Sequence, residues 1–281
     1  MRAQGLKTQT YKTGGAFYRV LLCALMSAAI WAAFAFARAK LGIPLAFSIQ
    51  KESVQTQAAP SEAKESVYLT NEISLTGRAW YALQLGAFTQ ENAAWQLSQE
   101  FITRGAAGYV WRDENIYRVY AAAYPTRAEA QSVQTRLSDQ GVTTYIQPLS
   151  EPEITLRAAG SEREVVAVRE AISYLDALST KLYTLSTALD AGDMDAASAL
   201  SALESECMTC HALVEALEKA FDQTLPAEIT PLKTLLEALY AEKSAFQNNM
   251  SAARVGAALK RCQLTATAGI GNFVAGLSAQ P

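Results

Sequence analysis

The clearest chemical pattern in the sequence is C-x-x-C-H, formed by Cys207, Cys210 and His211. In this spacing two thiols attach a c-type haem and the histidine binds its iron. His211 is the only histidine in the chain, so a site built on several imidazoles is excluded. Four cysteines in 281 residues are too few for a disulfide scaffold. The pattern therefore predicts a haem or redox site, unless the cysteines have a structural role.

The two cysteines also lie where a structural role would place them. Cys207 and Cys210 continue an apolar stripe with helical spacing, which predicts thiols buried in a helical core. Cys262 lies on a second such stripe, so it could form a disulfide with either of them. We expect core cysteines and no cofactor. A disulfide or thiol pair, and a haem held by Cys207, Cys210 and His211, stay open as alternatives.

No constellation in the sequence predicts an enzyme. Adjacent helical side chains diverge by about 100°, so His211 is poorly placed to act as a base for Cys210. The acidic residues are scattered over predicted solvated faces. The net charge of −3, from 24 Lys+Arg and 27 Asp+Glu, argues against a nucleic-acid partner. We expect a non-enzymatic protein that binds no nucleic acid.

The N-terminal region predicts a membrane anchor. Eighteen uncharged residues lie between Arg19 and Arg38, and a helix of that length spans about 27 Å, close to the hydrocarbon thickness of a bilayer. The basic residues before this run place the N-terminus in the cytoplasm. We expect a cytoplasmic tail over 1–19, a transmembrane helix over 20–38 and the bulk of the chain outside. Cleavage after Ala37, as in a signal peptide, is the alternative.

The middle of the chain contains an internal duplication, which follows a polar linker over 39–77. Residues 78–148 match themselves at an offset of 36, so that Leu83 pairs with Val119. Each half is predicted to form a strand, a helix and a second strand. Two such units predict a βαββαβ fold with both helices on one face of a four-stranded antiparallel sheet.

Strand alternation predicts which side chains lie on the other, open face of the sheet. If Leu83 and Leu85 pack beneath the helices, the neighbouring positions point away from them. The candidate binding residues on this face are Gln84, Tyr109, Trp111, Arg118, Tyr120 and Tyr145. Aromatic rings beside amide and guanidinium groups suit sugars or single-stranded bases, and the acidic balance favours sugars. Coverage of some of these residues by the linker or the C-terminal region is the alternative.

The duplication resembles the SPOR domain family over residues 78–150. The resemblance rests on YALQLGAF followed by Glu91-Asn92-Ala93, and on Tyr117-Arg118-Val119 through Arg127-Ala128-Glu129-Ala130 to Gly141. It implies an RNP-like fold that binds peptidoglycan, in particular glycan strands stripped of stem peptides at septa. It also implies binding along the open face, with Gln84 and Arg118 at motif positions. The sequence departs from the family pattern at Ala122 and Tyr124, where the family has glycine and phenylalanine.

The C-terminal third predicts a four-helix bundle over 156–279. Ser161 and Glu164 form a capping box for a first helix that ends at Gly192. Further helices are predicted from Asp193 to before Pro226, from Thr230-Pro231, and from Ser251, the last loosening at Gly269 and Gly271. This region resembles no family, and it could contact division or sporulation proteins.

The expected fold class is α+β: an N-terminal transmembrane helix, a βαββαβ RNP-like SPOR domain and a C-terminal all-α bundle. The expected function is peptidoglycan binding in cell division or sporulation, by a single-pass protein of the bacterial cell membrane. A membrane-anchored c-type haem or redox protein that uses residues 207–211 is the alternative.

Overall fold

The computed structural model describes residues 48–51, 69–151, 153–246 and 250–278, all of which belong to one compact unit. The predicted cytoplasmic tail and transmembrane helix lie outside the described residues. Within the described part of the chain, no helix is long and apolar enough to cross a membrane.

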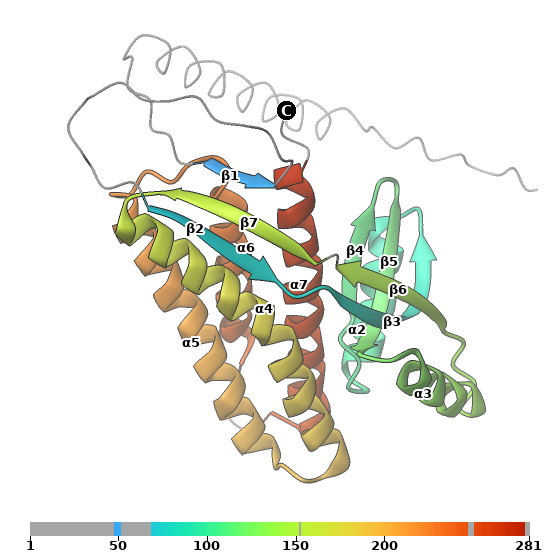
Figure 1. Cartoon of the computed structure of the whole chain (residues 1–281). Coiled ribbons are helices and arrows are strands. Elements are labelled where there is room, and N and C mark those ends of the chain that lie inside the picture. Colours follow the sequence, from blue (N-terminus) through green and yellow to red (C-terminus); the bar gives the residue numbers. More distant parts are fainter. Residues whose placement is uncertain (1–47, 52–68, 152, 247–249, 279–281) are drawn as a thin grey trace, which may run out of the picture. The chain divides into compact units, whose positions relative to one another are not determined.

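Residues 78–151 form the predicted βαββαβ fold (Figure 1). Its strands are β3 (Arg78–Phe88), β4 (Tyr109–Asp113), β5 (Ile116–Tyr124) and β6 (Tyr145–Glu151), all antiparallel in the order β4-β5-β3-β6. Its helices are α2 (Glu91–Ile102) and α3 (Arg127–Asp139). Both helices lie on one face of the sheet, where Leu83 is fully buried against Ala130 and Val133. The predicted inward position of Leu83 is confirmed.

Equivalent glycines follow the two helices of the duplication. Gly105 has φ +91° and Gly141 has φ +78°, a left-handed conformation that side chains disfavour. Helix α3 begins with a capping box in which the Thr126 hydroxyl accepts from the Glu129 backbone N–H. These local signals set the helix ends, and so they set where each following strand starts.

A three-stranded sheet lies where the sequence predicted a linker and the start of an all-α region. Its strands are β1 (Ser48–Lys51), β7 (Ile154–Gly160) and β2 (Leu69–Leu75), antiparallel in the order β1-β7-β2. On β7, Ile154 and Leu156 are buried, and on β2, Ile73 and Leu75 are buried in the same core. The C-terminal region is therefore α+β and not all-α. The missed signal is the alternation of Ile154, Leu156 and Ala158 along β7, which is typical of a half-buried strand.

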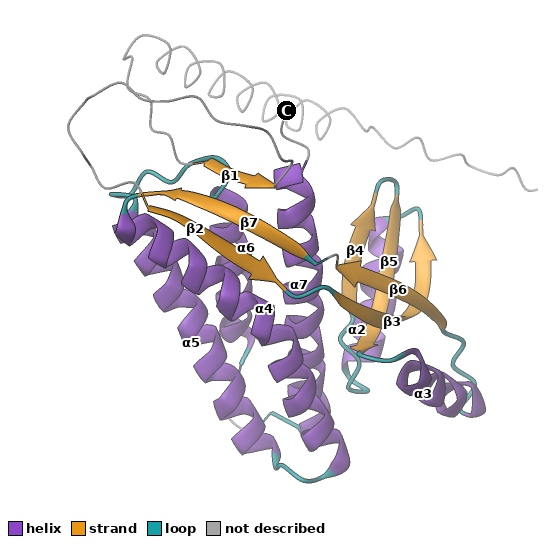
Figure 2. Cartoon of the chain, in the orientation of Figure 1, coloured by secondary structure: helices purple, strands orange, loops and turns teal. Residues whose placement is uncertain are grey.

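Four long helices complete the C-terminal region (Figure 2). They are α4 (Glu162–Ala191), α5 (Ala196–Ala220), α6 (Thr230–Ala241), which a short 3₁₀ turn η1 (Glu242–Ala245) follows, and α7 (Ala252–Ser278). The predicted capping box is confirmed, because the Glu164 carboxylate accepts from the Ser161 backbone N–H at 2.7 Å. Gly192 ends α4 with φ +80°. One apolar core joins these helices to β2 and β7.

Helix α7 does not loosen at its glycines, which corrects the prediction from sequence. It runs through Gly269 and Gly271 without a break. A Cβ atom on Gly269 would lie 2.2 Å from Leu235 Cδ1 of α6, whereas a Cβ on Gly271 would meet nothing within 4 Å. Gly269 therefore allows α6 and α7 to approach closely. The packing gained by this approach offsets the low helix propensity of glycine.

The two glycines predict opposite effects of the same substitution. Gly269→Ala should lower the free energy of unfolding by about 1–3 kcal/mol, because overpacking against Leu235 outweighs the gain in helix propensity. Gly271→Ala should raise it by up to about 1 kcal/mol, because alanine favours the helix and has room there. Urea titrations of both variants measure the difference. Equal stability of the two would contradict the close approach of α6 and α7.

Candidate functional site

Four of the predicted site residues form one row across the four-stranded sheet. Cross-strand register pairs Tyr109 with Tyr120, Tyr120 with Gln84, and Gln84 with Tyr145. Directly opposed residues of adjacent strands point to the same face. The sequence prediction that these side chains share a face is therefore confirmed.

The other two predicted residues extend this row. Trp111 is paired with Arg118 in the register of β4 and β5, and its ring meets Tyr120 edge-on at a centroid distance of 6.3 Å. Arg118 Nη1 donates to Gln84 Oε1 at 3.1 Å, and Arg118 Nε lies 3.1 Å from Asp113 Oδ2. The face thus combines aromatic rings with a guanidinium and an amide that are held in place by hydrogen bonds.

Tyr120 is at the centre of the face and is only 1 % exposed. Burial raises the pKa of its phenol to about 12, so the hydroxyl stays neutral at physiological pH. It donates to Gln147 Oε1 at 2.9 Å. Gln147 therefore lies on the same face, which confirms the orientation that alternation from Tyr145 along β6 predicts.

The expectation that this face is open to solvent is wrong for its central part. Leu264 of α7 is fully buried there against Trp80, Ala82 and Tyr120. The alternative considered from sequence, coverage by the C-terminal region, describes this part of the face. Tyr145 remains 68 % exposed, and Arg118 is half-buried. Alternation identifies a face, but it contains no information about what packs on that face.

Trp80 belongs to the same face and was missed by the sequence analysis. It is 3 % exposed, and its ring meets Tyr183 of α4 edge-on at 5.8 Å. Among the described residues, no acceptor pairs with its Nε1–H. The signal that could have found it is alternation along β3, which places Trp80 and Ala82 on the side of Gln84.

The comparison with known families settles the nature of this sheet. The SPOR domain family matches residues 78–148, about a quarter of the chain. These residues are a SPOR domain. SPOR domains are binding domains and not catalytic ones, and their presence implies peptidoglycan binding and a role in cell division. Searches of the curated proteins and of the solved structures found no match to the chain.

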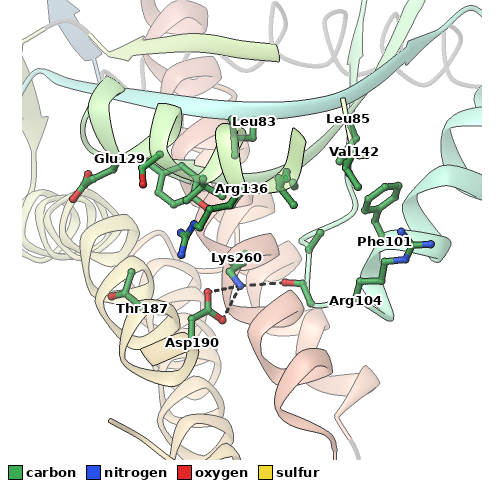
Figure 3. Close-up of a pocket in the computed structure, with 18 of the residues that line it drawn as sticks. Leu83, Leu85, Phe101, Arg104, Glu129, Arg136, Val142, Thr187, Asp190 and Lys260 are labelled. Atoms are coloured by element: carbon green, nitrogen blue, oxygen red, sulfur yellow. Dashed lines mark hydrogen bonds and ion pairs between the residues drawn. The ribbon is translucent and has the colours of Figure 1, made fainter. Parts of the chain in front are cut away.

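A cavity of about 580 Å³ lies on the helix side of the SPOR domain. Its apolar lining includes Leu83, Leu85 and Phe101, and its rim is charged (Figure 3). On the rim, Lys260 of α7 donates to the Gly105 carbonyl at 3.1 Å and lies 2.8 Å from Asp190 Oδ2 of α4. These contacts tie the SPOR domain to two helices of the C-terminal region.

The C-x-x-C-H residues do not form a site that fits a haem. Cys207 and Cys262 are buried, and the hydrogen bond between their thiols lowers the pKa of Cys207 and raises that of Cys262. Cys210 is also buried, which raises its pKa to about 12. His211 is stacked on the Tyr240 ring at 4.4 Å. Within the described part of the chain, Cys207, Cys210 and Cys262 are free thiols, packed as small apolar residues in the core.

This packing predicts how the thiols react. Cys207, Cys210 and Cys262 should resist iodoacetamide in the folded protein, because each is at most 2 % exposed, and should react in urea. Peptide mass spectrometry assigns the alkylated sites. Alkylation in native buffer, or a haem-sized mass gain on the peptide with His211, would contradict the packed core.

Proposed function

We propose that this protein is a membrane-anchored, non-enzymatic peptidoglycan-binding protein that acts at septa, in cell division or sporulation. The SPOR domain over residues 78–148 carries the proposal. Its ligand is the glycan strand from which the stem peptides have been removed. The sheet face that contains Gln84, Arg118 and Tyr120 is the proposed contact surface.

The chemistry of this face suits a denuded glycan. The exposed ring of Tyr145 and the half-buried ring of Trp111 offer flat apolar surfaces for sugar rings. Arg118 supplies hydrogen-bond donors beside these rings, and the buried Gln84 amide accepts from Arg118 and holds it in place. Removal of a stem peptide leaves a carboxylate on the lactyl group of muramic acid, and a guanidinium binds carboxylates well. Arg118 is therefore the proposed contact for that carboxylate.

The location of the protein is part of the proposal. The basic tail over 1–19 and the apolar segment over 20–38 support a single-pass anchor with a cytoplasmic N-terminus. This topology puts the SPOR domain outside the bacterial cell membrane, where peptidoglycan lies. The C-terminal helices are then available to division or sporulation proteins in the same compartment.

Sacculus binding tests the proposed contact surface. Tyr145→Ala and Arg118→Ala should each weaken co-sedimentation of the detergent-solubilised full chain with amidase-treated sacculi by about tenfold, the effect of one important contact. Trp95→Ala is the matched control, because Trp95 is 47 % exposed but lies on α2. Wild-type binding by both test variants would show that the glycan contacts another surface. Binding that does not increase after amidase treatment would contradict the preference for denuded strands.

Protease accessibility tests the proposed topology. Protease added to intact protoplasts should digest the SPOR domain and the C-terminal helices and spare a membrane-bound fragment that contains the first forty residues. Immunoblots with tags at each end of the chain distinguish the two parts, and a cytoplasmic protein serves as the control for lysis. A soluble form beginning near Arg38 would instead show cleavage after Ala37.

A further inference from the structure

The face proposed to bind glycan is the same face on which α7 packs. Leu264 is buried in one cluster with Trp80, Ala82, Tyr120 and Ala123 of the SPOR domain, and not in the main core of the C-terminal helices. A sugar ring could not stack on the central aromatic residues while Leu264 lies there. Helix α7 lies beside the four-stranded sheet (Figure 1), so a ligand on the centre of this face would have to displace it.

The contact of α7 also uses a free edge of the sheet. Strand pairing between β4 and β5 ends at Tyr109 and Tyr120, so the carbonyls of β5 beyond this pair have no partner in β4. The Ala107 N–H donates to the Ala121 carbonyl at 2.7 Å, and Gln263 Nε2 of α7 donates to the Ala123 carbonyl at 3.1 Å. Gln263 thus satisfies a buried acceptor that the short strand leaves unpaired.

The closed contact nevertheless contains a defect. The Trp80 indole N–H is buried and has no acceptor among the described residues. A buried donor without a partner is unfavourable, since water would satisfy it in an open form. Sugar hydroxyls can accept from an indole N–H, whereas the Leu264 side chain cannot. The covered surface thus leaves unsatisfied one donor that a polar ligand could satisfy.

The SPOR domain is connected to the C-terminal region at two adjacent strand junctions. Strand β2 ends at Leu75 and β3 begins at Arg78, while β6 ends at Glu151 and β7 begins at Ile154. At this junction a Cβ on Gly77 would lie 2.6 Å from the Glu153 backbone nitrogen, so the two connections cross closely. Rotation about a few residues here, with loss of the Lys260 contact to Gly105 and the Trp80 contact to Tyr183, would separate the sheet face from α7 without unfolding either part.

We propose that the C-terminal region autoinhibits the SPOR domain, with Leu264 and Gln263 of α7 occupying the centre of the glycan-binding face until a denuded glycan strand displaces them. This proposal rests on the proposed function, because it takes the sheet face as the peptidoglycan site. Apparent affinity falls by the fraction of molecules that are open. The closed form therefore weakens binding to denuded strands by that factor, and anything that opens the contact restores the full affinity.

Weakening the closed contact tests this regulation. The double variant Gln263→Ala/Leu264→Ala removes the hydrogen bond to the Ala123 carbonyl and the packing of Leu264 on the face. The variant, as detergent-solubilised full chain, should bind amidase-treated sacculi about tenfold more tightly than the wild type, because a larger fraction is open. Asn272→Ala is the matched control, an exposed position on the same helix. Thermal unfolding of each variant checks that the fold is retained.

The outcomes separate the regulation from the function. Tighter binding by the double variant but not by Asn272→Ala supports autoinhibition. Equal, measurable binding by the wild type and both variants overturns it and leaves the proposed function intact. Absence of binding by all three proteins overturns the proposed function and the autoinhibition with it.

Hydrogen exchange on the wild-type chain gives a reading that does not depend on a variant. Soluble denuded glycan strands should speed amide exchange at the junction around Gly77 and in α7 near Gln263, because the protecting contact is lost. Exchange should slow at the same time in β4, at the edge of the covered face. Slower exchange in both α7 and β4 would overturn the proposal, because it would show the glycan binding to the closed form.

Discussion

The double pairing of β3 is the constraint on which the rest of this structure depends. β3 pairs with β5 on one side and with β6 on the other, and its continuation β2 pairs with β7, the continuation of β6. The pairing brings Gln84 next to both Tyr120 and Tyr145, although the three residues are distant in sequence. It also directs Leu83 to the helices and Trp80 to the opposite face. A one-residue slip of this register would exchange the two sets of side chains.

One surface therefore has two possible partners. Tyr120 and Trp80 are aromatic residues suited to a glycan, and the same apolar character lets them pack on Leu264. The polar groups around these rings differ in whether α7 supplies a hydrogen-bond partner. Gln263 pairs with the Ala123 carbonyl, whereas the Trp80 N–H has no acceptor among the described residues. A contact that is well packed but incompletely hydrogen-bonded can be stable and still be exchanged for a polar ligand.

Small side chains allow close contacts between helices within the leucine-rich core of the C-terminal region. Gly269 allows α7 to approach Leu235 of α6, and the thiols of Cys207 and Cys262 meet between α5 and α7. A C-x-x-C-H pattern can therefore arise from core packing, because two cysteines three positions apart lie on the same side of a helix. His211 points elsewhere and stacks on Tyr240. The pattern has the spacing of a haem site without its surroundings.

The sequence by itself determined the elements and the faces of the SPOR domain. The offset of 36 residues and the alternation around Leu83 are periodic, so they can be read without a structure, and the capping box at Ser161 in the C-terminal region is local in the same way. Only the tertiary structure decided that β2 pairs with β7, that Gly269 is a packing position and that Leu264 covers Tyr120. Each of these depends on a partner far away in the sequence, and an exposed aromatic face and a covered one have the same alternation. Local periodicity reports which side chains point the same way, whereas their burial depends on a surface contributed by another part of the chain.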